Sequence, residues 1–136
     1  MVKRFGVSLE DELLEKFDTL LLEEGYSNRS EAIRDLIRDS LVRREWEEEE
    51  SEIAGVAILV YNHHEHELAQ KVTDIQHHHF GFVIASMHAH LDEHNCLEVI
   101  LMRGKAKEIK RFADSLICTR GVKHGQFVAT TTGTGL

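Results

Sequence analysis

Two histidines occupy alternate positions of an apolar segment, and a cysteine follows after a short polar stretch. His88 and His90 stand in the run IASMHAHL, and Cys96 comes after DEHN. Imidazole nitrogens and a thiolate sulfur are ligands for Zn(II), Cu(II) and Ni(II). The residue types and their spacing therefore predict a metal site, while ligand chemistry alone leaves the choice among these metals open.

The alternation also predicts which groups meet, because the side chains of a strand point in turn to its two faces. We expect residues 82–91 and 96–102 to pair as a hairpin connected by residues 91–95. In that register His90 lies opposite Cys96. A single histidine on a sheet is often only a surface residue, but a His-x-His pair facing a cysteine favours metal binding.

The same register sets His88 opposite Glu98 and divides the hairpin into two faces. We predict that the face without histidine lies beneath the helices and that the histidines and Cys96 occupy the helix-free face. The residues assigned to the helix-covered face are Val83, Ala85, Met87, Ala89, Leu91, Leu97, Val99 and Leu101.

A fourth ligand is predicted to come from a second chain. His77 ends a predicted helix, on the side of the sheet opposite to His88 and His90 in this assignment, so it would reach only the site of a chain docked on the helix-free face. Phe82, Ile84 and Ile100 would leave that face apolar and in need of cover. The other histidines are interpreted as solvated or without comparable partners: His63, His64, His66, His78, His79, His94 and His124.

The elements that position these groups form a predicted β-α-β-β-α-β module, the split βαβ pattern with both helices on one face. Its strands are 53–61, 82–91, 96–102 and 121–131, and its helices are 65–78 and 105–117.

The N-terminal part predicts a strand followed by two helices. In KRFGVSL apolar residues alternate, and the helix after it has Ser8 as its expected N-cap and Gly25 as its expected end. The second helix begins at Asn28, which has capping-box spacing to Glu31. A lone strand needs a partner, so we expect it to pair with the same strand of another chain; such a ribbon fits the DNA major groove.

Composition sets the remaining bounds. The chain has 136 residues and a net charge of −8, which argues against wholesale electrostatic binding to nucleic acid but allows a small basic reading surface. No apolar run is long enough for a membrane span, no signal peptide is recognised, and two cysteines make no disulfide framework, so we expect a cytoplasmic protein. The acidic run 45–52 is interpreted as a solvated helix end or linker between domains 1–50 and 51–136.

Four motifs together, NRSEAIRDLI, QHHH, MHAHLDEHNCLE and RGVKHG, resemble the nickel-responsive transcriptional regulators. The resemblance implies an α+β fold: an intertwined ribbon-helix-helix dimer followed by a ferredoxin-like, ACT-type domain, assembled as a homotetramer, a dimer of dimers. It implies square-planar Ni(II) held by His88, His90 and Cys96 of one subunit and His77 of another.

The resemblance further implies that Gln76 and Glu98 orient the ligands, and that a second cation site lies near Glu31 and Asp35. The predicted contacts with operator double-stranded DNA combine the outward face of the ribbon with phosphate contacts near the second helix. They are Lys3, Arg4, Gly6, Ser8, Asn28 and Arg29. Gly6 departs from the family's reading strand, which commonly carries a polar side chain there.

We therefore predict a nickel-dependent repressor that controls nickel uptake genes. Other hypotheses are a zinc- or copper-binding ribbon-helix-helix regulator, a metal storage or chaperone protein, and an antitoxin-like DNA binder. An ACT domain that senses amino acids is not favoured, because it would need a glycine-rich ligand loop that we do not recognise in the sequence. An enzyme is not expected, because four protein ligands leave a metal no open position for substrate.

Overall fold

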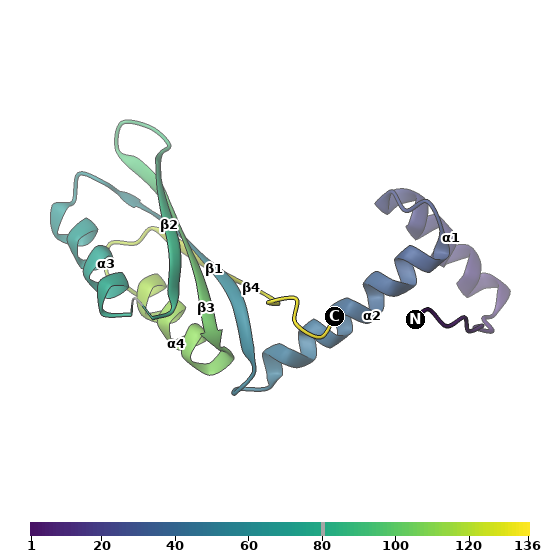
Figure 1. Cartoon of the computed structure of the whole chain (residues 1–136). Coiled ribbons are helices and arrows are strands. Elements are labelled where there is room, and N and C mark those ends of the chain that lie inside the picture. The colour runs from purple at the N-terminus through teal and green to yellow at the C-terminus, as the bar shows by residue number, and fades with distance from the viewer. Residues whose placement is uncertain (80) are drawn as a thin grey trace. The chain divides into compact units, whose positions relative to one another are not determined.

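The structure is a computed structural model that describes residues 1–79 and 81–136, with the His66 side chain also left out. The chain forms two compact units, Met1–Ser40 and Leu41–Leu136 (Figure 1). The predicted domain boundary between residues 50 and 51 stays a prediction. Within the described part of the chain, no helix is long and apolar enough to cross a membrane.

The first unit contains helix α1 (Asp11–Glu24) and the first part of helix α2 (Arg29–Glu47), which continues into the second unit. The predicted N-terminal strand is absent from the single chain, because residues 1–10 form neither helix nor strand. Phe5 and Val7 are exposed there. Strand pairing requires a partner for the backbone N–H and C=O groups, and no described part of the chain forms a strand with this segment.

The ends of the two helices follow local chemistry, with one correction. Gly25 closes α1 in the left-handed region at φ 82°, and the next amide, that of Tyr26, donates to the Leu21 carbonyl at 2.9 Å. Asn28 caps α2 as predicted, since its Oδ1 accepts from the Glu31 amide at 2.9 Å. The Ser8 cap is wrong: α1 begins at Asp11, so its N-cap position falls on residue 10, where no side chain makes a capping bond.

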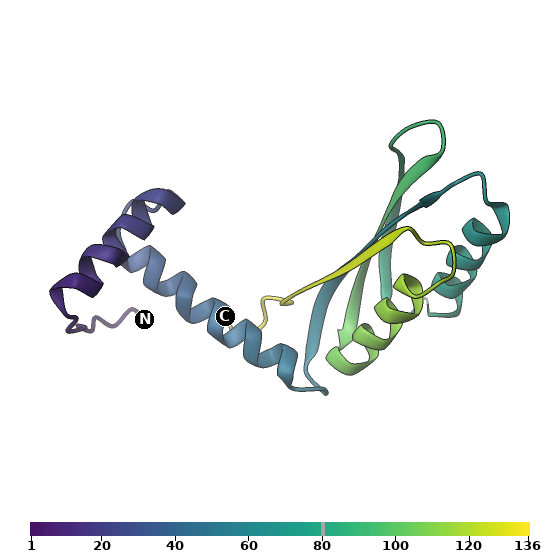
Figure 2. The ribbon, with the colours of Figure 1, turned by 180° about the vertical axis from the view of Figure 1, so that it is seen from behind.

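The second unit is a four-stranded sheet with two helices on one face. Its strands are β1 (Glu52–Asn62), β2 (Val83–His90), β3 (Asn95–Lys105) and β4 (His124–Thr130), in the order β2-β3-β1-β4 with antiparallel neighbours. Its helices are α3 (His66–His78) and α4 (Ala106–Ile117). Figures 1 and 2 show both helices on the same side of the sheet, as the split βαβ pattern predicts.

The face of the sheet that the helices cover is the reverse of the one predicted. On β3 the buried residues are Cys96, Glu98, Ile100 and Met102, and all but the carboxylate belong to the hydrophobic core. Met87 on β2 is instead 70% exposed, on the helix-free face. Alternation favoured the wrong parity because Glu98 makes one side of β3 look polar, although Ile100 and Met102 share that side. The buried side of β1, from Ile53 to Tyr61, decides which parity of β3 joins the core.

The acidic run after α2 is exposed, as predicted, but it is also paired. Glu52 accepts two hydrogen bonds from Arg103, at 3.0 and 3.4 Å. Glu50 lies 2.9 Å from Lys105, and Glu49 lies 3.8 Å from Lys107. The last turn of α2 is held to the same unit, since the Trp46 indole donates to the Thr130 carbonyl at 3.1 Å.

Candidate metal centre and DNA-contacting residues

The hairpin has the register that residue spacing predicts. His90 pairs with Cys96 and His88 pairs with Glu98 along β2 and β3. A bulge near Val83 shifts the pairing only at the far end of β2, so it does not disturb these two rows. Two imidazoles and one thiol therefore lie on one face of adjacent strands, and the carboxylate of Glu98 lies beside them.

Cys96 is fully buried and stands against Tyr61 of β1, its neighbour in the sheet. Its Sγ donates to the Tyr61 carbonyl at 3.3 Å. Burial raises the pKa of the Cys96 thiol, so the metal-free chain holds it protonated. A metal ion that takes this sulfur as thiolate must displace its proton, which makes binding dependent on pH.

The side chain of Glu98, on β3, lies near one residue of β2 and one of α3. Gln76 of α3 donates to its Oε2 at 3.3 Å, and the Nδ1 of His88 lies 3.7 Å from its Oε1. Glu98 and Gln76 are both buried, at 7% and 8% exposure. Burial raises the pKa of the Glu98 carboxyl, and the neighbouring His88 opposes that shift. The ligand-orienting role that the resemblance implies for both residues stays a prediction; the structure shows their contact with each other and the approach of Glu98 to His88.

His63 is a residue of this site that sequence analysis missed. Its ring centroid lies 4.4 Å from that of His90, and its Nδ1 is buried without a hydrogen-bond partner in the described structure. Burial lowers the pKa of His63, so the neutral imidazole is favoured. The His64 ring centroid lies 4.3 Å from that of His63, with the rings tilted, and 5.5 Å from that of His94 of the hairpin. The prediction that these loop histidines are merely solvated is wrong for His63.

His77 is not where the face assignment placed it. Its neighbour Gln76 bonds Glu98 from α3, so α3 lies on the same side of the sheet as His88, not on the far side. The His77 side chain itself is exposed. Among the described residues of this single chain, no three potential ligands are grouped closely enough to hold a metal ion.

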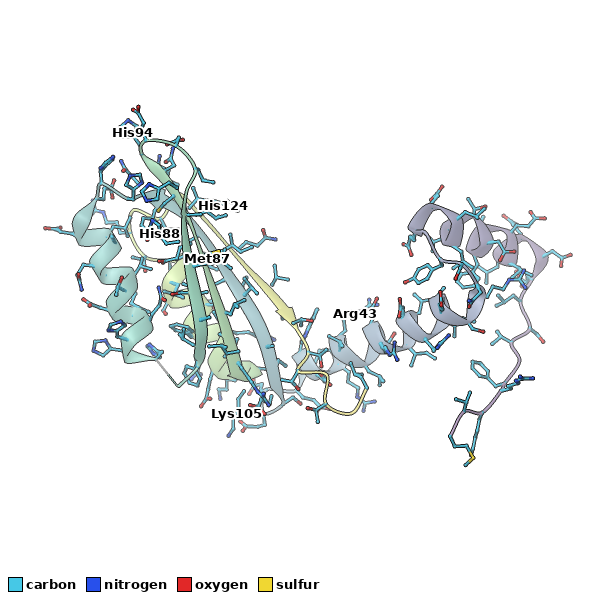
Figure 3. All side chains as sticks on the ribbon, turned by 45° about the horizontal axis from the view of Figure 1, so that its top comes forward. Arg43, Met87, His88, His94, Lys105 and His124 are labelled. Carbon is cyan, nitrogen blue, oxygen red and sulfur yellow. The ribbon has the colours of Figure 1, made fainter. Side chains whose placement is uncertain are left out.

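The donor set nevertheless fits a late first-row divalent metal. His88 and His90 present imidazole nitrogens from the exposed edge strand β2, and Cys96 offers the softer sulfur. Beside these donors, the Glu98 carboxylate accepts from the Gln76 amide and lies near His88, the kind of outer contact that typically orients a metal ligand. Figure 3 shows His88 on β2 and His94 at the end of the hairpin.

The predicted DNA contacts divide into free and occupied side chains. Lys3, Arg4 and Ser8 are exposed in the segment before α1. The guanidinium of Arg29 is already engaged, because its Nε and Nη2 donate to both oxygens of Asp18 at 2.9 and 2.8 Å. The side-chain carbonyl oxygen of Asn28 is likewise occupied, because it accepts the capping hydrogen bond at the start of α2.

The two carboxylates of the predicted second cation site have protein partners. Glu31 accepts from the Ser27 hydroxyl at 3.0 Å, and Asp35 accepts from the Tyr26 hydroxyl at 2.6 Å. Arg38 lies 3.8 Å from Asp35. These contacts account for both side chains without a cation, and the second site stays a prediction.

The fold and the donor set together define a class: a ribbon-helix-helix unit followed by a metal-binding α+β regulatory domain. Two family models match accordingly. Residues 3–44 match the ribbon-helix-helix proteins of the copG family, and residues 54–130 match the NikR C-terminal nickel-binding domain.

Similar proteins extend this match to nearly the whole chain. A protein of Geobacter sp. (strain M21) is 56% identical over 98% of this chain and 96% of its own length, and one of Pyrococcus furiosus is 54% identical over 97% and 96%. One of Caldanaerobacter subterraneus is 56% identical over 99% of this chain and 88% of its own. All three are described as nickel-responsive regulators. The chain belongs to this family of nickel-responsive transcriptional regulators, which are not enzymes, and its cofactor is Ni(II).

Proposed function

We propose that the chain is a repressor that binds operator DNA when Ni(II) occupies a site shared between subunits, and that it controls nickel uptake genes. The ligands are His88, His90 and Cys96 of one subunit and His77 of another. The observation that carries this proposal is the pairing of His90 with Cys96 beside His88 and the buried Glu98.

A shared site is supported by the position of its parts. His88 and His90 are exposed on the edge strand β2, where a second subunit has access to them, and His77 is exposed on α3. When bound, Ni(II) would accept lone pairs from imidazole and thiolate donors and so link them. The chain's own residues bind it, hold the two strands in register and release the Cys96 proton.

Assembly into a homotetramer is supported by the apolar surface left on each unit. In the first unit Phe5 and Val7 are exposed in a segment that lacks a strand partner. In the second unit Met87, Leu101 and Val128 are exposed on the helix-free face of the sheet. Two interfaces of different kinds, a ribbon and a sheet face, build a dimer of dimers.

Regulation follows if Ni(II) binds the DNA-competent arrangement better than the others, because a ligand shifts an equilibrium only by its difference in affinity between the states. In the competent arrangement two ribbons meet DNA together. Arg4 and Ser8 then face the bases, while Lys3 and the amides at the start of α2 face phosphates.

The test combines selection of an operator with a cysteine pair. A random duplex library is selected on Ni-loaded wild-type protein, and binding to the selected duplex is followed by fluorescence anisotropy with and without Ni(II). We expect Ni(II) to tighten binding, Cys96→Ala to abolish the nickel effect, and Cys118→Ala, a change at the exposed second cysteine, to keep it. Nickel-independent binding, or an equal loss in both variants, would contradict the proposal.

A further inference from the structure

The turn of the metal-bearing hairpin is fastened by its own side chains. The Asp92 Oδ1 accepts from the amides of His94 and Asn95, both at 2.8 Å, and the Asn95 Nδ2 donates to the Asp92 Oδ2 at 3.0 Å. The Leu91 amide donates to the Asn95 carbonyl at 2.9 Å. This turn joins the two strands directly after His90 and directly before Cys96.

A lysine from a distant part of the chain completes this set of bonds. The Lys123 Nζ donates to the Asn95 Oδ1 at 2.5 Å, from the segment that leads into β4. The backbone of Lys123 is itself fixed, since its amide donates to the Val60 carbonyl of β1 at 2.8 Å. The backbone that carries the ammonium group is therefore held in place, although the side chain is exposed.

The chemistry at residue 95 is specific. One end of the Asn95 amide donates to a carboxylate and the other accepts from an ammonium, so Asp92 and Lys123 together fix its orientation. A carboxylate at 95 would face Asp92 with like charge, and an apolar side chain would satisfy neither partner.

We infer that Lys123 is a positioning residue for the metal site: through Asn95 it holds the hairpin turn so that His90 and Cys96 stay paired before the metal binds. The inference rests on the proposed function, because it takes those two residues as ligands. A turn that is ordered before the metal binds reduces the conformational entropy lost on binding. Lys123 thereby sets affinity and leaves the ligand set unchanged.

The test is Lys123→Met, with Lys71→Met as control. Lys71 is also an exposed lysine, on α3, and forms no hydrogen bond or ion pair within the described structure. Nickel affinity is measured by competition with a chelator, and the thiolate-to-Ni absorption band reports the ligands. We expect Lys123→Met to weaken Ni(II) binding about tenfold, as loss of an outer contact does, with the band unmoved. Lys71→Met should match wild type.

A double-mutant cycle shows whether Lys123 acts through Asn95. In the Asn95→Ala background, Lys123→Met should cause no further loss of nickel affinity. In the wild-type background, Lys123→Arg keeps a cation at this position and should keep most of the wild-type nickel affinity. Additive losses, or wild-type affinity in Lys123→Met, would overturn the inference. If Lys123→Met does not fold, Lys123→Ala removes the same bond and is judged by the same criterion.

Amide exchange in the metal-free protein separates this inference from the proposed function. Lys123→Met should speed exchange at Leu91 and Asn95, whose amides close the turn. Unchanged exchange would overturn the inference. If Lys123→Met speeds exchange but the Ni-loaded wild-type protein shows no thiolate-to-Ni band, the turn is positioned as inferred and the proposed ligand set is what fails.

Discussion

Gln76 of α3 and Glu98 of β3 form a buried hydrogen bond of 3.3 Å between the amide nitrogen and the carboxylate. This bond fixes the last turn of α3 over the strands that carry His88 and Cys96. It also gives a hydrogen-bond donor to a buried carboxylate whose other oxygen lies 3.7 Å from the His88 Nδ1, and an unsatisfied buried acceptor is costly.

Replacing Gln76 by leucine should therefore destabilise the protein. We expect the free energy of unfolding to fall by about 1–3 kcal/mol, because Glu98 loses a donor in a buried place. Urea denaturation at matched protein concentration measures the change. Gln70→Leu on the same helix is the control, since Gln70 bonds Asp74 at an exposed position; it should alter stability by less than about 0.5 kcal/mol. Equal effects would show that the Glu98 contact contributes nothing.

The phenol of Tyr26 should titrate at a higher pH than an ordinary tyrosine. Its hydrogen bond to Asp35 raises its pKa to about 12. Because the folded pKa lies above the usual value of about 10, the bond stabilises the fold fully below pH ~10, and this contribution is lost as the pH rises through the folded pKa. The difference in phenolate absorbance between wild type and Tyr26→Phe isolates this group from Tyr61. Asp35→Asn should bring the titration back toward its ordinary range; a midpoint that Asp35→Asn leaves in place would remove Asp35 as the cause.

The pairing of the metal ligands was predictable from the sequence, but the face that carries them was not. Alternation over HAH and a short polar connection are local features, and they fix the row His90–Cys96. The choice of face depends on which side of β1 meets α3 and α4, and Val99 and Ile100 are equally apolar candidates for the core. Helix packing decided the choice, and no local pattern encodes it.

Two other features lay outside the reach of sequence patterns for different reasons. His63 approaches His90 because the end of β1 lies beside the hairpin in the folded sheet, a contact between distant segments that no spacing announces. The N-terminal ribbon, by contrast, was predicted as a strand, and residues 1–10 of the single chain do not form one. In the proposed assembly, the hydrogen bonds that would order it come from a second chain.

Nickel in the proposed site should be diamagnetic. Three imidazoles and one thiolate in a square plane give Ni(II) a low-spin state with all electrons paired, whereas tetrahedral or six-coordinate Ni(II) is paramagnetic. Magnetic susceptibility of the Ni-loaded protein, with the metal-free protein as baseline, measures this. A paramagnetic moment at one nickel per chain would contradict the square-planar geometry.

Arg4 and Lys3 should differ in their effects on DNA binding. Arg4→Ala is expected to weaken binding to the selected operator by about 1–3 kcal/mol and to relax preference at one base, as loss of a contact to guanine does. Lys3→Ala should weaken binding to all sequences and reduce the salt slope by about 1. Anisotropy titrations over a salt series on operator and scrambled duplexes separate the two. Equal, sequence-independent losses would make Arg4 a backbone contact.

The last prediction concerns which subunit's metal site His77 serves. Since α3 lies on the same side of the sheet as His88, the fold does not forbid His77 from serving its own chain. Yet His77 is exposed, and the described residues of one chain do not assemble a three-ligand group. We therefore expect nickel to bridge two subunits.

Mixing His77→Ala protein with Cys96→Ala protein tests this expectation. Neither parent has four intact ligands, but in a mixed interface His77 of the Cys96→Ala chain meets His88, His90 and Cys96 of the other chain. Subunit exchange, verified by native mass spectrometry, should restore part of the wild-type nickel spectrum, up to one site per mixed pair. His78→Ala is the control, because the His78 ring is held by the Asp74 carbonyl at 2.7 Å; that variant should bind nickel unaided. Exchange without any recovered site would place His77 in its own chain's site or outside the ligand set.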